Sequence, residues 1–209
     1  MIVVRWTPSQ GMMLLDGVHL KKQNMKLHPN EYYHIYNRSN NSEVVFKSQE
    51  NYSLFLKKYK QYFESDLDTI AYCLMPTHFH FLVFVKTETP DRVNRNIGVL
   101  LSSYTHAMNL NYGRHGSLFQ HHTKAKPVSD EDYLVTLMTY IHQNPIRWKL
   151  AKRLEDWEFS SYLDLIGVRN DSQRPLVNKE FIKHYFASSE EFERFSKEVL
   201  ENVRSEFWV

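Results

Sequence analysis

Two histidines, His78 and His80, stand two residues apart at the start of an apolar run and could bind a metal ion. Side chains alternate across a β-strand, so both imidazoles would lie on the same face. The residues after them are apolar on both faces, which is typical of a strand in the centre of a sheet. Histidine pairs with this spacing also occur on strands that bind nothing, so a third ligand must come from elsewhere.

A second pair of polar side chains, Tyr140 and Asn144, lies four residues apart in a run with helical periodicity. This spacing puts them one turn apart on one face of a helix, so a hydroxyl and an amide oxygen would point the same way. The chain has 13 tyrosines, and asparagine is frequent at helix ends. The pair alone therefore does not indicate a catalytic site.

The histidines need a sheet to hold them, and the flanking sequence predicts one. Two β-rich runs, 70–75 and 78–85, surround Pro76-Thr77 and predict an antiparallel hairpin. An earlier strand is expected at 31–36, a helix from Ser48, a second helix from Thr89 to Gly113, and a further strand before Lys126. This order indicates an α+β fold, in which both helices cover one side of an antiparallel sheet and leave the other side free for a ligand.

A third helix is expected to carry Tyr140. It would begin at Ser129, with the hydroxyl as cap, and end at Asn144, because Pro145 disfavours the helical conformation in the residue before it. Two more helices, at about 179–186 and 189–207, would form a C-terminal helical appendage over 166–209. Residues 1–29 have weak periodicity and are expected to be a peripheral extension.

Composition bounds the class of protein. With 209 residues and 42% hydrophobic content, the chain can bury one sizeable core. The net charge is only +2, although basic residues cluster at 57–60, 114–126 and 147–153. The single cysteine, Cys73, excludes a disulfide within the chain. No membrane span or signal-peptide core is visible, so the cytoplasm is the expected compartment.

Five segments together resemble a known family, the HUH-type single-tyrosine transposases, in the branch of the REP-associated tyrosine transposases. Their order and spacing match across about residues 30–165. The segments are Tyr-Asn-Arg-Ser-Asn-Asn at 36–41, Leu-Met-Pro-Thr-His-Phe-His-Phe-Leu-Val at 74–83, Gly-Ser-Leu-Phe-Gln at 116–120, Tyr-Ile-His-Gln-Asn-Pro at 140–145 and Trp-Glu-Phe-Ser-Ser-Tyr at 157–162.

The resemblance implies a catalytic domain at 30–165 with a ferredoxin- or RRM-like core. It makes Tyr140 the nucleophile and makes His78, His80 and Asn144 the ligands of a divalent metal ion, Mg²⁺ or Mn²⁺. The implied reaction nicks and rejoins hairpin-bearing single-stranded DNA through a 5′-phosphotyrosine, by a monomer or a homodimer. The residues expected to contact DNA are Asn37, Arg38, Arg114, His122, Lys124 and Lys126.

Three positions depart from the family pattern: Thr77 replaces a frequent asparagine, Glu158 replaces a frequent proline, and His122-Thr123-Lys124 replaces an arginine-tyrosine-lysine stretch. Two other functions stay open. A sheet with two helices and exposed aromatic and basic side chains could bind single-stranded nucleic acid without cutting it. An HUH nuclease could also serve plasmid replication or transfer.

Overall fold

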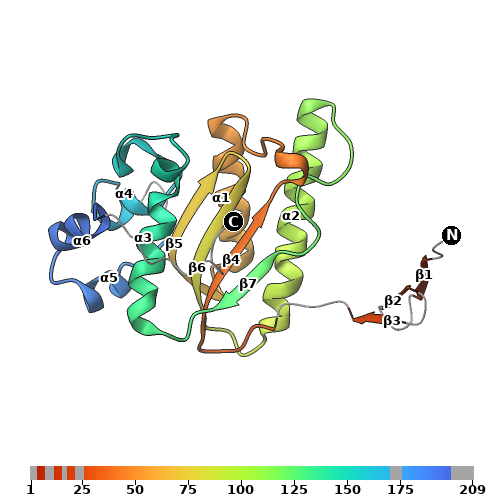
Figure 1. Ribbon diagram of the computed structural model, residues 1–209, viewed down its shortest axis with the longest axis horizontal. Coiled ribbons are helices and arrows are strands. Elements are labelled where there is room, and N and C mark those ends of the chain that lie inside the picture. The colour runs from red at the N-terminus through yellow and green to blue at the C-terminus, as the bar shows by residue number, and fades with distance from the viewer. Residues whose placement is uncertain (1–3, 8–11, 16–17, 22–25, 170–175, 199–209) are drawn as a thin grey trace.

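A four-stranded antiparallel sheet forms the centre of the protein in the computed structural model (Figure 1). The structure describes residues 4–7, 12–15, 18–21, 26–169 and 176–198. The strands lie in the order β5-β6-β4-β7, with every neighbouring pair antiparallel. Their bounds are Tyr32–Arg38 for β4, Leu67–Met75 for β5, His78–Val85 for β6 and Lys124–Pro127 for β7. The predicted α+β class, hairpin and central position of β6 are confirmed.

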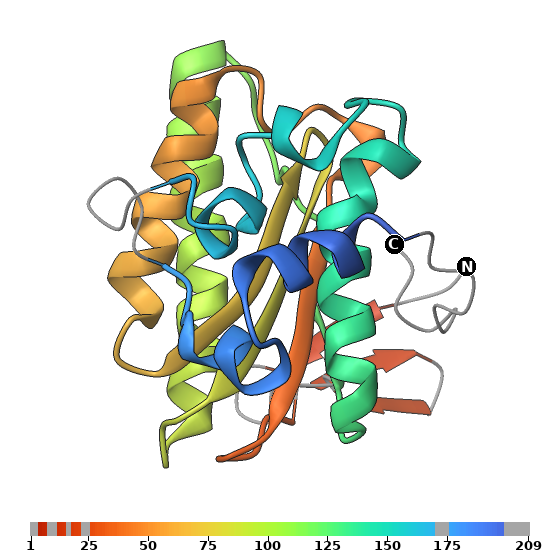
Figure 2. The same ribbon diagram turned by 90° about the vertical axis from the view of Figure 1, so that its left-hand side faces the viewer.

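Helices α1 (Gln49–Phe63) and α2 (Pro90–Tyr112) cover one face of the sheet, as the sequence predicts (Figure 2). Their aromatic and aliphatic stripes pack on alternate residues of β4, β5 and β6 in one hydrophobic cluster. Gly113 ends α2 in the left-handed conformation, with φ of 58°, which favours glycine at a helix end. Ser48 precedes α1 as predicted, but its side chain makes no capping hydrogen bond.

The opposite face is not free, and that part of the expectation is wrong for β5 and β6. Helix α3 (Glu131–Arg147) packs across these two strands (Figure 2). Its apolar side chains join the residues of β5 and β6 that face away from α1 and α2, including Cys73, which is completely buried. An amphipathic helix reveals that it has an apolar face, but not which surface will cover that face.

Both predicted ends of α3 shift, the start by one residue and the end by three. Asp130, rather than Ser129, is the N-cap, and its carboxylate accepts a hydrogen bond from the Tyr133 amide at 3.2 Å. The helix also continues through Pro145 to Arg147 instead of ending at Asn144. Proline lacks the N–H that would bond the Ile141 carbonyl. The side-chain amide of Asn144 donates to that carbonyl at 3.4 Å and to the Tyr140 carbonyl at 2.9 Å.

The C-terminal part adds three short helices, α4 (Tyr162–Leu165), α5 (Glu180–Tyr185) and α6 (Ser189–Ser196). The last two match the predicted C-terminal pair, although the stretch of the second beyond 198 lies outside the described residues. Their buried aromatic residues belong to the same hydrophobic cluster as α3. These helices therefore lie beside α3 and pack against the same face of the sheet, where the Phe181 ring of α5 is 6.0 Å from the Tyr32 ring of β4, measured between centroids (Figure 2).

Near the N-terminus, three strands form a sheet of their own in the order β1-β2-β3, which the sequence does not predict. Their bounds are Val4–Thr7, Met12–Leu15 and Val18–Lys21. Two single turns of 3-10 helix, η1 (Asn40–Ser42) and η2 (Leu154–Asp156), lie in loops. Within the described residues, no helix combines the length and apolar character needed to cross a bilayer.

Candidate active site

His78 and His80 lie at the start of the central strand β6, immediately after the β5–β6 turn. Both face the α3 side of the sheet, because they alternate with Phe79 and Phe81, which pack under α1 and α2. The two ring centroids are 5.1 Å apart, and the ring planes are inclined by 81°. Only 3% of His78 and none of His80 is exposed. The predicted pairing of the two imidazoles on one face is present in the structure.

Each of the two imidazoles is held by one nitrogen and leaves the other without a partner. The Nδ1 atom of His80 lies 2.9 Å from Nε2 of His34, and Nδ1 of His78 lies 3.1 Å from the Thr77 hydroxyl. The Nε2 atoms of both His78 and His80 are buried and have no hydrogen-bond partner among the described residues. A neutral imidazole protonated on Nδ1 presents its lone pair on Nε2. Two buried, unsatisfied Nε2 atoms on neighbouring imidazole rings fit a pair of metal ligands.

Burial keeps these imidazoles neutral. It lowers the pKa of His78 to about 4, with a further contribution from the positive charge of Arg38, and lowers the pKa of His34 to about 3. The pKa of His80 also falls well below its usual range, mainly because the ring is completely buried. Neutral imidazole is the form that coordinates a metal. These groups are therefore ready to act as ligands at neutral pH.

Tyr140 reaches the same place from α3. Its ring centroid is 6.2 Å from that of His80, with the two rings nearly perpendicular at 87°. The Arg147 guanidinium lies over the Tyr140 ring at 5.4 Å from its centroid. Burial raises the pKa of the Tyr140 phenol, and Arg147 acts in the opposite direction. The phenol is therefore protonated at neutral pH and must lose its proton to act as a nucleophile.

Asn144 lies one turn beyond Tyr140 and is 1% exposed. Its amide nitrogen donates hydrogen bonds to the two helix carbonyls, which fixes the side chain. The amide oxygen remains available to bind a metal ion. Within the described residues, no three His, Cys, Asp or Glu side chains cluster so that they could hold a metal ion. The amide oxygen of Asn144 is the third ligand that the resemblance implies.

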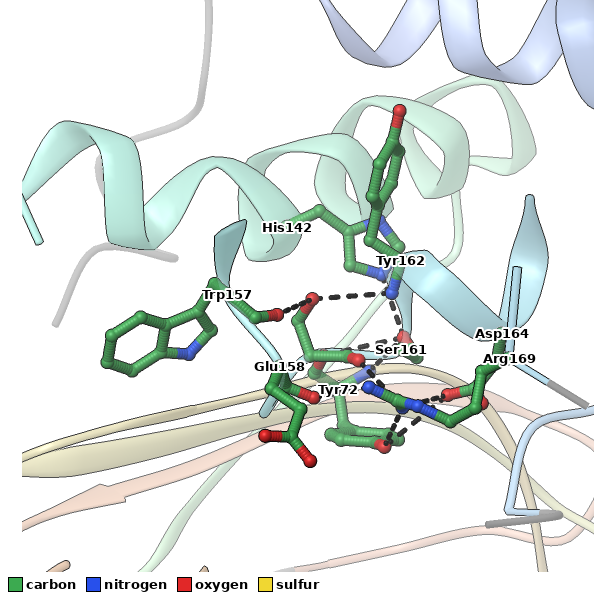
Figure 3. A network of polar contacts seen from close by, with 9 residues as sticks. Tyr72, His142, Trp157, Glu158, Ser161, Tyr162, Asp164 and Arg169 are labelled. Carbon is green, nitrogen blue, oxygen red and sulfur yellow. Dashed lines mark hydrogen bonds and ion pairs between the residues drawn. The ribbon is translucent and has the colours of Figure 1, made fainter. Parts of the chain in front are cut away.

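A buried polar network fastens α3 to the sheet (Figure 3). The Ser161 hydroxyl accepts a hydrogen bond from the Tyr72 amide of β5 at 2.9 Å and lies 2.7 Å from Nε2 of His142 on α3. Beside it, Arg169 forms a buried ion pair with Asp164 at 2.9 Å and donates to the Tyr72 hydroxyl at 3.3 Å. Because His142 is two residues from both Tyr140 and Asn144, this network fixes the height of the candidate residues over β6.

Two of the residues expected to contact DNA already have partners inside the protein. Asn37 is buried, and its amide donates to the Gln120 carbonyl at 3.1 Å and to the Thr123 hydroxyl at 2.9 Å. Arg114 forms a two-pronged ion pair with Glu43, with both distances at 2.9 Å. Both residues therefore stabilise loops near the sheet.

The other four candidates are more accessible. Arg38 is exposed and pairs in register with His78, while Lys124 pairs with Tyr36 and Lys126 with His34, so both lysines share the face of the histidines. His122 is also exposed, and it lines a groove of about 590 Å³ between α2 and the loop before β7. None of the expected ligands or the nucleophile lines this groove.

Three residues at the site are not among those that the sequence singles out. Thr77 stands out there only as a departure from the family pattern, and His34 only as part of the first strand. Trp148 follows α3 directly, and its ring centroid is 5.5 Å from that of His78. The sequence contains some indication of two of these residues. His34 is a histidine inside an apolar strand, and Trp148 stands in a run of alternating basic and apolar residues.

Comparisons with known proteins found similarities in sequence and in structure. No protein-family model matches the chain. A REP-associated tyrosine transposase of Haemophilus influenzae is 25% identical over 118 residues, which cover 52% of this chain and 66% of that protein, slightly less than two thirds of its length. A solved structure described as a REP-associated tyrosine transposase bound to a REP hairpin matches with a TM-score of 0.57 and 16% identity, over 77% of this chain and 90% of that one.

A bacterial tRNA(His) guanylyltransferase-like protein in complex with GTP also matches, with a TM-score of 0.43 and 9% identity over 61% of this chain and 70% of that one; this likeness is too weak to carry an argument. The resemblance inferred from the five segments is confirmed in sequence and in fold.

Proposed function

We propose that this chain, which resembles the REP-associated tyrosine transposases in sequence and fold, cuts and rejoins single-stranded DNA that carries a hairpin. The observation that carries this proposal is the contact of the Tyr140 ring with His80, which lies beside His78, because both histidines have a buried Nε2 atom without a partner. An unsatisfied buried polar atom costs about 1–3 kcal/mol, so two of them together call for a function. A module that only binds nucleic acid needs neither the histidine pair nor the tyrosine.

His78, His80 and Asn144 would hold a divalent cation, with Mg²⁺ or Mn²⁺ the expected ion because the donors mix nitrogen with oxygen. Such an ion, when bound, acts as a Lewis acid that relieves the negative charge of a phosphate. The protein's own share is to keep both imidazoles neutral and oriented. His34 and Thr77 contribute by occupying the Nδ1 atoms.

In the proposed reaction, the Tyr140 phenolate oxygen attacks the phosphorus of one phosphodiester. The bond from phosphorus to the 3′ oxygen breaks, and the 5′ phosphate stays on the tyrosine. The leaving 3′ oxygen takes up a proton from water, in balance with the proton that the phenol gave up, and leaves as a free 3′-hydroxyl. A 3′-hydroxyl can then attack this phosphotyrosine, which restores a phosphodiester and releases the phenol. Each step exchanges one phosphate ester for another, so the reaction consumes no nucleoside triphosphate. Arg147, over the Tyr140 ring, favours the phenolate that the attack requires.

Tyr140→Phe tests the proposal, because it removes only the nucleophilic hydroxyl. End-labelled single-stranded DNA with a hairpin is incubated with protein and Mn²⁺, and the products are separated on a denaturing gel. The wild type should give a covalent protein–DNA band, and the Phe variant should give none while it still binds the DNA. Tyr62→Phe, which removes a tyrosine hydroxyl from α1 on the other face of the sheet, is the matched control and should leave the band unchanged.

The same assay separates the remaining functions. Binding without any covalent band from the wild type would favour the non-catalytic nucleic-acid-binding module. A band that persists in Tyr140→Phe would remove this residue from the mechanism. Adding a second DNA with a free 3′-hydroxyl tests rejoining, and use of a plasmid origin instead of a repeated hairpin would favour the nuclease of plasmid replication or transfer.

A further inference from the structure

An exposed run of alternating apolar and basic residues begins where α3 ends. Five consecutive residues, 146–150, are exposed. The exposed fractions of the apolar members are 36% for Ile146, 56% for Trp148 and 47% for Leu150. A tryptophan exposed to this extent is uncommon on a protein surface, and exposed apolar groups that lie together mark binding sites.

Trp148 borders the candidate active site. Its ring is 5.5 Å from that of His78, measured between centroids, and its neighbour Arg147 lies over Tyr140. The Trp148 amide donates to the Asn144 carbonyl at 2.9 Å, so the backbone that carries the indole is tied to the last turn of the helix. The helix end thus holds the Trp148 backbone in place, and the exposed indole forms an aromatic surface at the rim of the site.

We propose that Trp148 is a stacking platform for an unpaired nucleobase next to the phosphate that enters this site. The inference rests on the proposed function and adds a base-binding subsite to it. Every base has a flat π-face, so an exposed indole binds single-stranded DNA with little dependence on sequence. The DNA backbone beside the stacked base would meet the basic members of the same run.

Charge favours a nucleic acid over a protein as the occupant. Lys149 and Lys152 are exposed, and neither forms an ion pair with a carboxylate among the described residues. Arg153, in contrast, is paired with Asp156. Lysine is depleted from the cores of protein interfaces, whereas cations beside an aromatic surface are typical of single-strand binding. Three apolar side chains are also far fewer than a stable dimer interface needs.

The test measures binding in the Tyr140→Phe background, where no cleavage disturbs the equilibrium. Fluorescence anisotropy follows the full-length protein with hairpin DNA whose single-stranded flank carries one abasic site at each position in turn. Trp148→Ala should weaken binding to intact DNA by between about fivefold and about a hundredfold. Trp148→Phe should restore most of the affinity. An abasic site at the position that stacks on Trp148 should weaken binding by the parent protein, which keeps Trp148. The same abasic site should not weaken binding by the Trp148→Ala variant any further.

Val99→Ala is the matched control, because Val99 is 46% exposed on α2, on the other face of the sheet. It should bind like its parent. Equal affinities of the Trp148 and Trp148→Ala proteins, or effects that simply add at every abasic position, would overturn the inference while leaving the proposed function intact. Failure of the parent protein to bind any single-stranded DNA would overturn both. Self-association that Trp148→Ala abolishes would overturn it too, by showing that a second copy of the chain covers the surface instead.

Discussion

At the scale of single residues, the orientation of each candidate histidine ligand depends on a neighbouring side chain that lies within hydrogen-bonding distance of its Nδ1 atom. His34 occupies Nδ1 of His80, and Thr77 occupies Nδ1 of His78. For Nε2 of His80 to offer a lone pair, its Nδ1 must carry the proton. The Nδ1–H group then donates a hydrogen bond to Nε2 of His34. Such outer partners commonly change metal affinity by about 10- to 100-fold when they are removed.

We therefore expect His34→Leu to weaken Mn²⁺ binding by about 10-fold or more. His34→Gln, whose amide oxygen can accept the same hydrogen bond, should recover part of the affinity. Electron paramagnetic resonance of free Mn²⁺ measures this without DNA or catalysis. His106→Leu, at an exposed histidine of α2, is the control. Unchanged affinity in His34→Leu would mean that the ring of His80 is held by packing alone.

The sequence predicts the histidine pair because alternation along one strand is local. It cannot predict the role of His34, which is 46 residues from His80 and reaches it only because β4 pairs with β6 in one register. That register sets Tyr36 opposite His80 and leaves His34 two residues further along the same face. The sequence does not predict the exposure of Trp148 for a similar reason, because exposure depends on which distant segments pack over a residue in the folded protein.

At the scale of elements, α3 shows where a sound local rule gives the wrong boundary. Proline disfavours helix in the residue before it, yet α3 passes through Pro145. Asn144 offsets part of the cost by donating its amide to the carbonyls of Tyr140 and Ile141. The three extra residues carry Arg147 to the ring of Tyr140. The rule for residues before proline does not consider such side-chain hydrogen bonds, which depend on the three-dimensional geometry of the helix.

Ser161→Ala tests what fastens α3 to the sheet. The substitution leaves the buried Tyr72 amide without its hydroxyl acceptor and removes the hydrogen bond with His142, so we expect the free energy of unfolding to fall by about 1–3 kcal/mol. Urea unfolding followed by circular dichroism measures it. Ser53→Ala, at an exposed position of α1, should change stability by less than about 0.5 kcal/mol. Equal decreases in the two variants would leave hydrophobic packing as the main attachment of α3.

At the scale of the whole molecule, the two faces of the sheet have separate tasks. The face under α1 and α2 is a continuous apolar core, whereas the other is divided between α3, over β5 and β6, and the polar region of β4 and β7. The sequence predicts the first face from regular stripes. It leaves the second open because neither α3 nor the C-terminal helices carry any mark of the surface they cover. The boundaries of the catalytic domain at 30 and 165 stay a prediction.

The charge on the polar half-face gives a prediction for the whole surface. Lys124 and Lys126 lie on the same side of the sheet as His34 and Tyr36 and should meet DNA phosphates. Replacing both by alanine should flatten the dependence of log affinity on log salt by about 0.7 for each phosphate that is no longer neutralised. Binding measured between about 50 mM and about 200 mM salt gives the slope. Lys57→Ala with Lys58→Ala, on α1, is the control and should keep the parental slope, whereas an unchanged slope in the Lys124 and Lys126 variant would place the DNA elsewhere.

The burial of Cys73 has a practical consequence for work on this protein. The chain has no other cysteine, and this thiol is completely enclosed between β5 and α3, where burial raises its pKa and suppresses the reactive thiolate. Alkylating reagents will therefore modify only molecules in which strand β5 has separated from α3. The rate of modification therefore reports the rate at which α3, which carries Tyr140, separates from the sheet. The measurement needs no added label or engineered residue.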